Sequence, residues 1–146
     1  MNKPNSEIIS EIVQELDSGC DCYLNNKTHE IIAIPNFGNF PDEVEFQELF
    51  KEDLMKVSEQ ASTFIKIEVL KSYESFKIME RFAQKLPNSQ FKTKLETILL
   101  NKKPFQKFKL AVESSEYRKL WFDFKRQEME EIVFQKLTSK PFDDQV

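Results

Sequence analysis

Glycine is scarce in this chain. Only two of its 146 residues are glycine, so few backbone positions can adopt a positive φ without a steric cost. A loop-rich all-β fold needs many such positions and is therefore not expected. Charged residues make up 32% of the chain and separate the apolar ones. The composition predicts a mostly helical protein with long charged faces.

Long apolar runs are missing as well. No stretch approaches the ~20 consecutive apolar residues of a transmembrane helix. The first fifteen residues contain a single lysine and no unbroken apolar block, so we expect no secretory signal there. These two observations predict a cytoplasmic protein that has no membrane partner.

Cysteine and histidine are represented by Cys20, Cys22 and His29 alone. A disulfide between Cys20 and Cys22 would close a very short, strained ring. We therefore expect two reduced thiols, as is usual in the cytosol. A closed zinc site needs four ligands of the Cys or His type, a number the chain does not reach. No metal ligand is assigned, and His29 is interpreted as an exposed turn residue.

The motifs of common enzymes are also missing. A Ser-His-Asp or Cys-His arrangement would have to use His29, the only imidazole. The sequence contains no Gly-x-Ser-x-Gly turn and no glycine-rich phosphate-binding loop. We assign no catalytic residue and no cofactor, and a nucleotide-binding enzyme of either standard kind is not expected.

Carboxylates are the only potentially catalytic side chains that are abundant in this sequence. In a helix, Glu45, Glu48 and Glu52 would share a face and could hold a divalent cation through oxygen ligands. A solvated helix face gives the same pattern, so a carboxylate- or cation-dependent enzyme remains an alternative. The acidic run is Asp42, Glu43, Glu45, Glu48, Glu52 and Asp53, and the same choice applies to Glu128, Glu130 and Glu131.

Apolar periodicity predicts the fold class α+β. We expect a small three-stranded antiparallel sheet from residues 20–34 and 62–67, packed by the first two helices, and a helical C-terminal half. The chain is predicted to form a single domain over residues 1–146, with flexible ends at about 1–5 and 138–146. The expected elements are a helix over 6–18, strands over 20–24 and 30–34, a helix over 42–60, a strand over 63–67, and four helices between Ser72 and about Leu137.

Polar residues and prolines predict where these elements begin and end. Side-chain oxygens before an apolar stripe indicate helix N-caps, and proline fits the first turn of a helix. The predicted caps are Asn5 or Ser6, Ser72, Ser89 and Ser115. Pro104 is expected at the first position of a helix, Pro87 after the end of one, and Pro35 at the end of the strand pairing.

Charge is divided along the chain. Residues 1–60 carry four lysines and thirteen acidic residues, a net charge of −9, whereas residues 61–146 carry a net charge of +5. Within the second half, residues 85–126 hold eleven basic and four acidic residues, a net charge of +7. Such asymmetry is typical of a face for a polyanion. It is equally consistent with two halves that pack together and neutralise each other.

The basic half contains two aromatic-basic blocks, Lys103-Pro104-Phe105-Gln106-Lys107-Phe108-Lys109 and Glu116-Tyr117-Arg118-Lys119-Leu120-Trp121-Phe122-Asp123-Phe124. Their aromatic rings, Phe105, Phe108 or Trp121, could stack on unpaired bases. An amphipathic helix whose aromatics face the core explains the pattern equally well. Nucleic-acid binding would require an exposed ring among Phe105, Phe108, Tyr117, Trp121 and Phe122. The candidate contacts to a polyanion or a partner are Lys102, Lys103, Lys107, Lys109, Arg118, Lys119, Lys125 and Arg126.

Several short motifs occur in a recognisable order. They are Tyr23-Leu24, Thr28-His29-Glu30-Ile31, Phe64-Ile65-Lys66-Ile67, Tyr73, Ile78-Met79-Glu80-Arg81-Phe82, Pro104-Phe105-Gln106-Lys107-Phe108-Lys109 and Trp121-Phe122-Asp123-Phe124. Over about residues 12–137 the chain resembles the bacterial family catalogued as uncharacterised protein family 0158. The family tends to have glycine in place of His29, which implies that His29 adopts a positive φ. It also tends to have proline in place of Glu68, which implies a different exit from the third strand.

Because the family has no agreed activity, the resemblance implies a fold and no mechanism. The sequence therefore predicts a small non-enzymatic cytosolic interaction protein. Its partner is left open, and an acidic protein and RNA are the two candidates. One alternative is an accessory protein that binds RNA or single-stranded nucleic acid through residues 102–126. The second alternative is the carboxylate- or cation-dependent enzyme.

Overall fold

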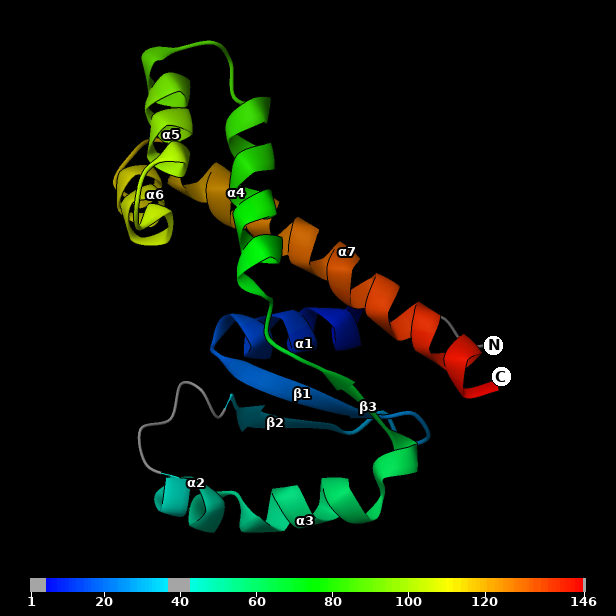
Figure 1. The fold of residues 1–146 in the computed structure, drawn as a ribbon. Coiled ribbons are helices and arrows are strands. Elements are labelled where there is room, and N and C mark those ends of the chain that lie inside the picture. Colours follow the sequence, from blue (N-terminus) through cyan, green and yellow to red (C-terminus); the bar gives the residue numbers. More distant parts are fainter. Residues whose placement is uncertain (1–4, 37–42, 146) are drawn as a thin grey trace. The chain divides into compact units, whose positions relative to one another are not determined.

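The computed structural model describes residues 5–36 and 43–145, and for residues 43, 44 and 139–145 it describes the backbone only. Its elements confirm the predicted α+β class, with a three-stranded sheet and a helical C-terminal half (Figure 1). In chain order they are α1 (Ser6–Asp17), β1 (Cys20–Asn25), β2 (Ile31–Pro35), α2 (Glu43–Leu49), α3 (Lys51–Glu59), the 3-10 turn η2 (Ala61–Thr63), β3 (Phe64–Ile67), α4 (Ser72–Lys85), α5 (Gln90–Leu100), α6 (Pro104–Glu113) and α7 (Arg118–Gln145).

The backbone divides into two compact units. The first unit consists of Met1–Val69 and Glu130–Val146, and the second consists of Leu70–Met129. Helix α7 belongs to the second unit in its first part and to the first unit in the remainder. The expectation of a single domain stays a prediction.

The sheet forms the centre of the first unit. Its strand order is β2-β1-β3 and both pairings are antiparallel, with Tyr23 opposite Ile32 on one side and Lys66 on the other. Helix α1 covers one face of the sheet, and α2 with α3 covers the other (Figure 1). The Cys22 thiol donates to the Ile12 carbonyl of α1, with a sulfur–oxygen distance of 3.7 Å. The prediction that the first helices pack the sheet is confirmed.

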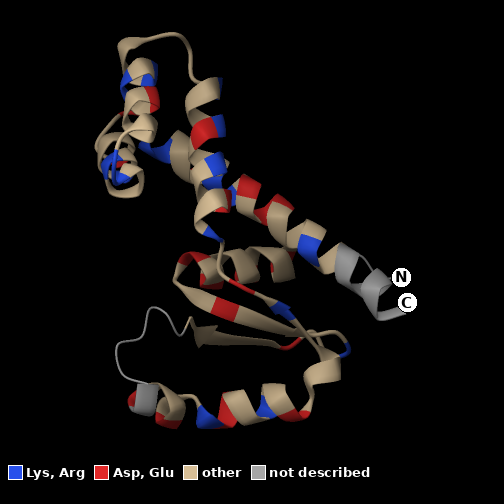
Figure 2. Ribbon diagram, viewed as in Figure 1, with Lys and Arg blue, Asp and Glu red and all other residues tan. Residues whose placement is uncertain are grey.

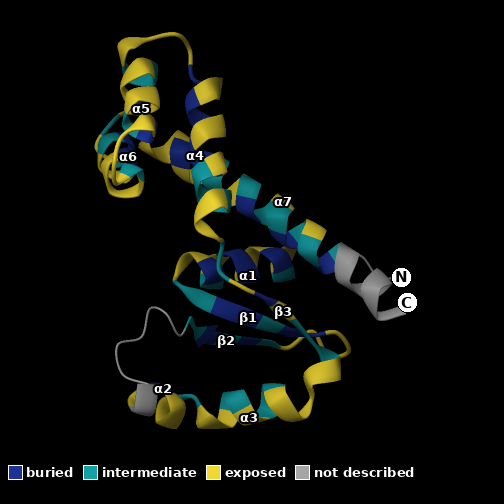
Figure 3. Ribbon diagram, in the orientation of Figure 1, coloured by how far each residue is buried: buried dark blue, intermediate teal, exposed yellow. Residues whose placement is uncertain are grey.

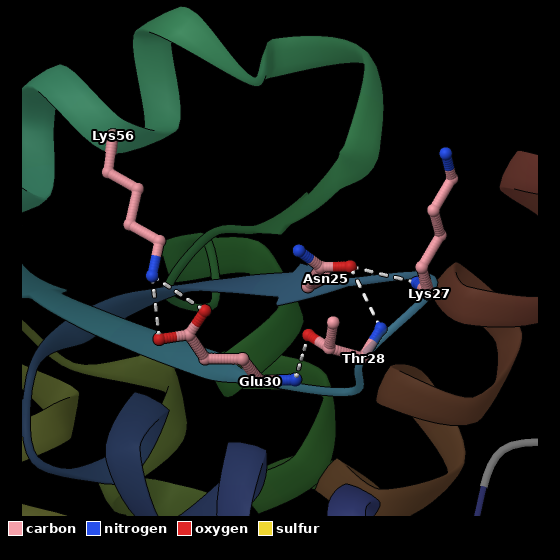
Figure 4. Close-up of polar contacts among 5 residues, drawn as sticks. All are labelled: Asn25, Lys27, Thr28, Glu30 and Lys56. Atoms are coloured by element: carbon pink, nitrogen blue, oxygen red, sulfur yellow. Dashed lines mark hydrogen bonds and ion pairs between the residues drawn. The ribbon is translucent and has the colours of Figure 1, made fainter.

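The turn between β1 and β2 is held by side-chain oxygens (Figure 4). Asn25 Oδ1 accepts from the backbone N–H groups of Lys27 and Thr28 at 2.9 and 3.0 Å, and Thr28 Oγ1 accepts from the N–H of Glu30 at 3.2 Å. His29 has a φ of 66° and is exposed. The expectation that His29 occupies a turn position with positive φ is therefore confirmed.

The helix predicted over residues 42–60 is two helices, which corrects the sequence-based prediction. The break lies at Phe50, where φ is −113° and ψ is 18°. The Phe46 and Phe50 rings lie 5.3 Å apart, and both pack with Ile32 on the sheet. The bend brings the apolar residues of both helices onto one sheet face. Lys56 of α3 adds an ion pair with Glu30 at 2.9 Å (Figure 4).

Pro35 is the last paired residue of β2, opposite Cys20, as predicted; proline is tolerated there because β2 is an edge strand. Two predicted helix starts are wrong. Ser72 is the first residue of α4 rather than its cap; the Glu74 carboxylate accepts from the N–H of Lys71 at 2.9 Å instead. The last helix begins at Arg118, because the Ser115 hydroxyl caps a preceding turn by accepting from the N–H of Tyr117 at 3.1 Å.

The remaining caps are confirmed. Asn5 Oδ1 accepts from the N–H of Glu7 at 2.6 Å, Ser89 Oγ accepts from the N–H of Lys92 at 3.2 Å, and Pro104 is the first residue of α6. Pro87 follows the end of α4.

The expectation of flexible ends at about residues 1–5 and 138–146 stays a prediction, and α7 extends to Gln145. The Thr138 hydroxyl donates to the Phe134 carbonyl at 2.9 Å, as in a regular helix. At the other end, Asn5 is fixed as the cap of α1, and residues 1–4 lie outside the described part.

Candidate polyanion-binding surface

Four aromatic rings, three of them buried and Phe124 half-buried, pack together in the second unit. Phe82 of α4 lies 6.4 Å from Phe108 of α6 and 5.2 Å from Trp121 of α7, and Phe108 and Trp121 lie 5.1 Å apart. Phe124 contacts the same Phe82 ring at 5.5 Å. These tilted and edge-to-face arrangements are favourable beyond their burial. Phe108 and Trp121 are buried, so the hypothesis that they stack on bases is wrong.

This core fixes the orientation of α6. Pro104 begins the helix after Lys103, whose φ of 55° is in the left-handed region. Phe108 and Val112 are one helical turn apart and both fully buried, so they face the same core. The opposite side of α6 is consequently turned to solvent, as Figure 3 shows by its exposed residues.

The eight basic residues that were predicted to contact a polyanion or a partner all lie in the second unit, on its surface. Seven are exposed and Lys125 is half-buried. Lys102 and Lys103 lie in the connection between α5 and α6, Lys107 and Lys109 on α6, and Arg118, Lys119, Lys125 and Arg126 on α7. Lys and Arg also mark α5 and α6 in Figure 2, where acidic residues mark α1 and both kinds of charge mark α3 of the first unit. We call these eight residues the basic surface.

Most of the basic surface is not neutralised locally. Arg126 Nη2 lies 3.5 Å from Asp123 Oδ1. Within residues 5–36 and 43–145 no ion pair involves Lys102, Lys103, Lys107, Lys109, Arg118 or Lys119. The second unit carries fourteen basic and seven acidic residues, a net charge of +7, whereas the first carries seven basic and eighteen acidic residues, a net charge of −11. The basic surface thus lies on the unit whose net charge is positive.

Two aromatic rings of the blocks are exposed, and they are not the ones that dominate the core. Phe105 is 41% exposed and Phe122 is 39% exposed. The Arg118 guanidinium carbon lies 5.1 Å from the centre of the Phe122 ring, a cation–π contact. Tyr117 is half-buried and stacked on Phe91 at 5.1 Å. Phe105 and Phe122 are thus the exposed rings of the blocks, the feature that nucleic-acid binding would require.

Sequence reasoning missed one apolar feature of this surface. Leu110 of α6 is 73% exposed. It lines an open depression of about 400 Å³ together with Gln106, Lys109, Glu113 and Ser114. The signal was present in the sequence, because Leu110 lies about 200° around a helix from Phe108 and so cannot share its core.

The candidate carboxylates whose side chains the structure describes do not converge. Glu45 and Glu48 are exposed on α2 and Glu52 is exposed on α3, because the break at Phe50 divides the predicted helical face. Asp42 lies outside the described residues. Glu128 pairs with Arg81 at 2.8 Å. The part of the chain that the structure describes contains no group of three or more His, Cys, Asp or Glu residues that could hold a metal ion.

The two cysteines are free thiols. Burial raises the pKa of Cys22 to about 12, and the nearby Glu15 carboxylate adds to the shift. The pKa of Cys20 is also raised, first by burial and then by Glu15. Since the thiolate is the reactive form, both side chains are poor nucleophiles at neutral pH.

The family match comes from comparison of the whole chain with protein families. Residues 5–145 match the family described as "Uncharacterised protein family (UPF0158)". The chain belongs to this family. No curated protein matches it, and neither does any solved structure. Membership accounts for nearly the whole chain and assigns no activity.

Among the described residues, no helix is both long enough and apolar enough to cross a membrane.

Proposed function

We propose that this protein is a non-enzymatic cytoplasmic binding protein whose basic surface binds an acidic partner protein. The observation that carries the proposal is the set of six exposed cations, on α6, α7 and the preceding connection, that lack an ion pair among the described residues.

Unpaired surface cations act mainly on partner choice and on the rate of association. Complementary charge steers an acidic partner to the surface and repels a basic one. Lysine side chains remain hydrated and mobile until a partner arrives, so each contact is weak and the sum is sensitive to salt. Such a surface suits a reversible contact better than a permanent assembly.

Binding of polyglutamate by the purified full-length protein tests this proposal. We expect binding at low salt that weakens steeply towards physiological salt. The double variant Lys107→Glu/Lys109→Glu should lose about tenfold or more in affinity, equivalent to at least ~1.4 kcal/mol. The matched control is Lys51→Glu/Lys77→Glu, which makes the same change in net charge at exposed sites outside the basic surface. Absence of binding at low salt, or equal losses in both variants, would contradict the proposal.

Single-stranded RNA is a second candidate ligand, because Phe105 and Phe122 are exposed beside the basic surface. Base–aromatic stacking contributes roughly 1–3 kcal/mol per base, so Phe105→Ala/Phe122→Ala should weaken RNA binding about tenfold or more and leave polyglutamate binding unchanged. Tighter binding of RNA than of polyglutamate, with that loss in the variant, would favour RNA over the acidic protein.

A further inference from the structure

We infer that the partner presents a short acidic amphipathic helix, and that this helix lies along the outward side of α6 with an apolar residue against Leu110. The inference rests on the proposed function and names the part of the partner that is recognised. We call the docking surface the α6 outer face and define it as Lys103, Gln106, Lys107, Lys109 and Leu110.

The first observation is the position of Leu110. It is 73% exposed on the side of α6 opposite Phe108 and Val112, which are both fully buried. Neighbouring side chains would partly cover a leucine that lies at the edge of the core. Leu110 lies instead at the middle of the outward side, where an incoming side chain could cover it without any rearrangement of the core.

The second observation is the depression beside Leu110. Its lining includes Gln106, Leu110 and Glu113, which are spaced by four and three residues and therefore follow one side of the helix. The depression thus runs along α6 for about two turns, roughly 11 Å. A row of side chains spaced by three and four residues on a second helix fits such a groove.

The third observation is the charge around the depression. Lys102, Lys103, Lys107 and Lys109 precede Glu113, and no acidic residue lies between them. The positive end of the α6 dipole lies at the same end of the helix. The partner helix should therefore place its acidic residues opposite residues 102–109, and an uncharged or basic residue opposite Glu113.

A helical partner fits this face better than an extended one. The backbone groups of α6 are bonded within the helix, so its side offers no backbone partners to an extended peptide, unlike the edge of a sheet. A helix satisfies its own backbone groups and needs from the surface only apolar contact and charge.

Two synthetic peptides with the same number of glutamates test the inference on the full-length protein. One carries leucines spaced by three and four residues, and the other carries glutamine at those positions. We expect the leucine peptide to bind roughly tenfold more tightly, which corresponds to burial of one leucine side chain, and to gain helical circular dichroism when it binds. Leu110→Gln should abolish this difference. Leu100→Gln, at an exposed leucine outside the depression, should preserve it.

The outcomes separate this inference from the proposed function. Equal binding of the two peptides, or a difference that survives Leu110→Gln, overturns the inference and leaves the acidic partner in place. A leucine peptide that binds without gaining helix overturns it as well. If neither peptide binds at low salt, both proposals fail, and binding of single-stranded RNA in the same series would then establish the nucleic-acid alternative.

Discussion

Phe105 and Phe108 show how different two neighbouring aromatics of one motif can be. Both belong to the strongest aromatic-basic block of the sequence, and spacing alone placed both on one apolar stripe. Phe108 packs against Phe82 and Trp121, whereas Phe105 is 41% exposed. The difference depends on the exact roll of α6, which the rings of α4 and α7 determine and which no local pattern contains.

Substitution of these two residues should therefore have unequal costs. We expect Phe108→Ala to lower the free energy of unfolding by about 3–5 kcal/mol, because it leaves a cavity in a closely packed core. Phe105→Ala should change it by less than ~1 kcal/mol, as is usual at the surface. Urea unfolding of both variants measures this, and similar losses would contradict the assignment of Phe108 to the core.

Cys22 predicts a dependence of stability on pH. Its pKa is raised to about 12 in the folded protein, chiefly by burial, so the folded state retains a proton that the unfolded state releases above its ordinary pKa of 9.0. The contribution of Cys22 is therefore fully present below pH 9 and is lost as the pH rises from 9 towards 12.

Unfolding by urea at pH 8 and pH 10 measures this effect. The wild-type protein should lose more stability over that interval than Cys22→Ala, which has no thiol to titrate. An equal loss in the two proteins would show that Cys22 does not resist ionisation in the folded state.

At the scale of elements, the apolar periodicity was enough to place the helices and strands but not their ends. Ser89 and Ser72 looked alike in the sequence as serines before an apolar stripe. Ser89 caps α5, whereas the cap of α4 is made by the Glu74 carboxylate and the N–H of Lys71. Which polar group caps a helix depends on backbone angles one residue away, and these follow from the path of the incoming chain.

This difference can be measured. Ser89→Ala should destabilise the protein by ~1 kcal/mol, the usual cost of losing a cap, and Ser72→Ala should cost less than ~0.5 kcal/mol, as for an ordinary surface position. Thermal unfolding of the two variants provides the comparison. A larger loss for Ser72→Ala would mean that the sequence-based cap was right after all.

The break at Phe50 is a second case in which local pattern was insufficient. The run from Glu43 to Glu59 has a continuous amphipathic pattern, and nothing in it breaks a helix. The break follows from tertiary contact, because Phe46 and Phe50 both pack on the Ile32 and Ile34 side of the sheet. The break also separates Glu52 from Glu45 and Glu48. The predicted cation site required all three carboxylates on one helical face, and that face does not form.

At the scale of the whole molecule, the division of charge was visible in the sequence and became sharper in the structure. The boundaries of the compact units turn a modest asymmetry along the chain into net charges of −11 and +7. All eight basic residues named from the sequence lie on the more basic unit, and six of them make no ion pair within residues 5–36 and 43–145. Helical spacing in the sequence already separates Leu110 from Phe108 by about 200°, and the structure adds that Phe108 is the buried residue of the two.

The central claim is that the basic surface of the second unit binds an acidic partner, and amide chemical shifts test it most directly. Titration of the ¹⁵N-labelled full-length protein with polyglutamate should perturb amides of residues 102–126 and leave those of β1, β2 and α3 unchanged. Perturbation spread over the acidic first unit, or no perturbation at low salt, would contradict the account.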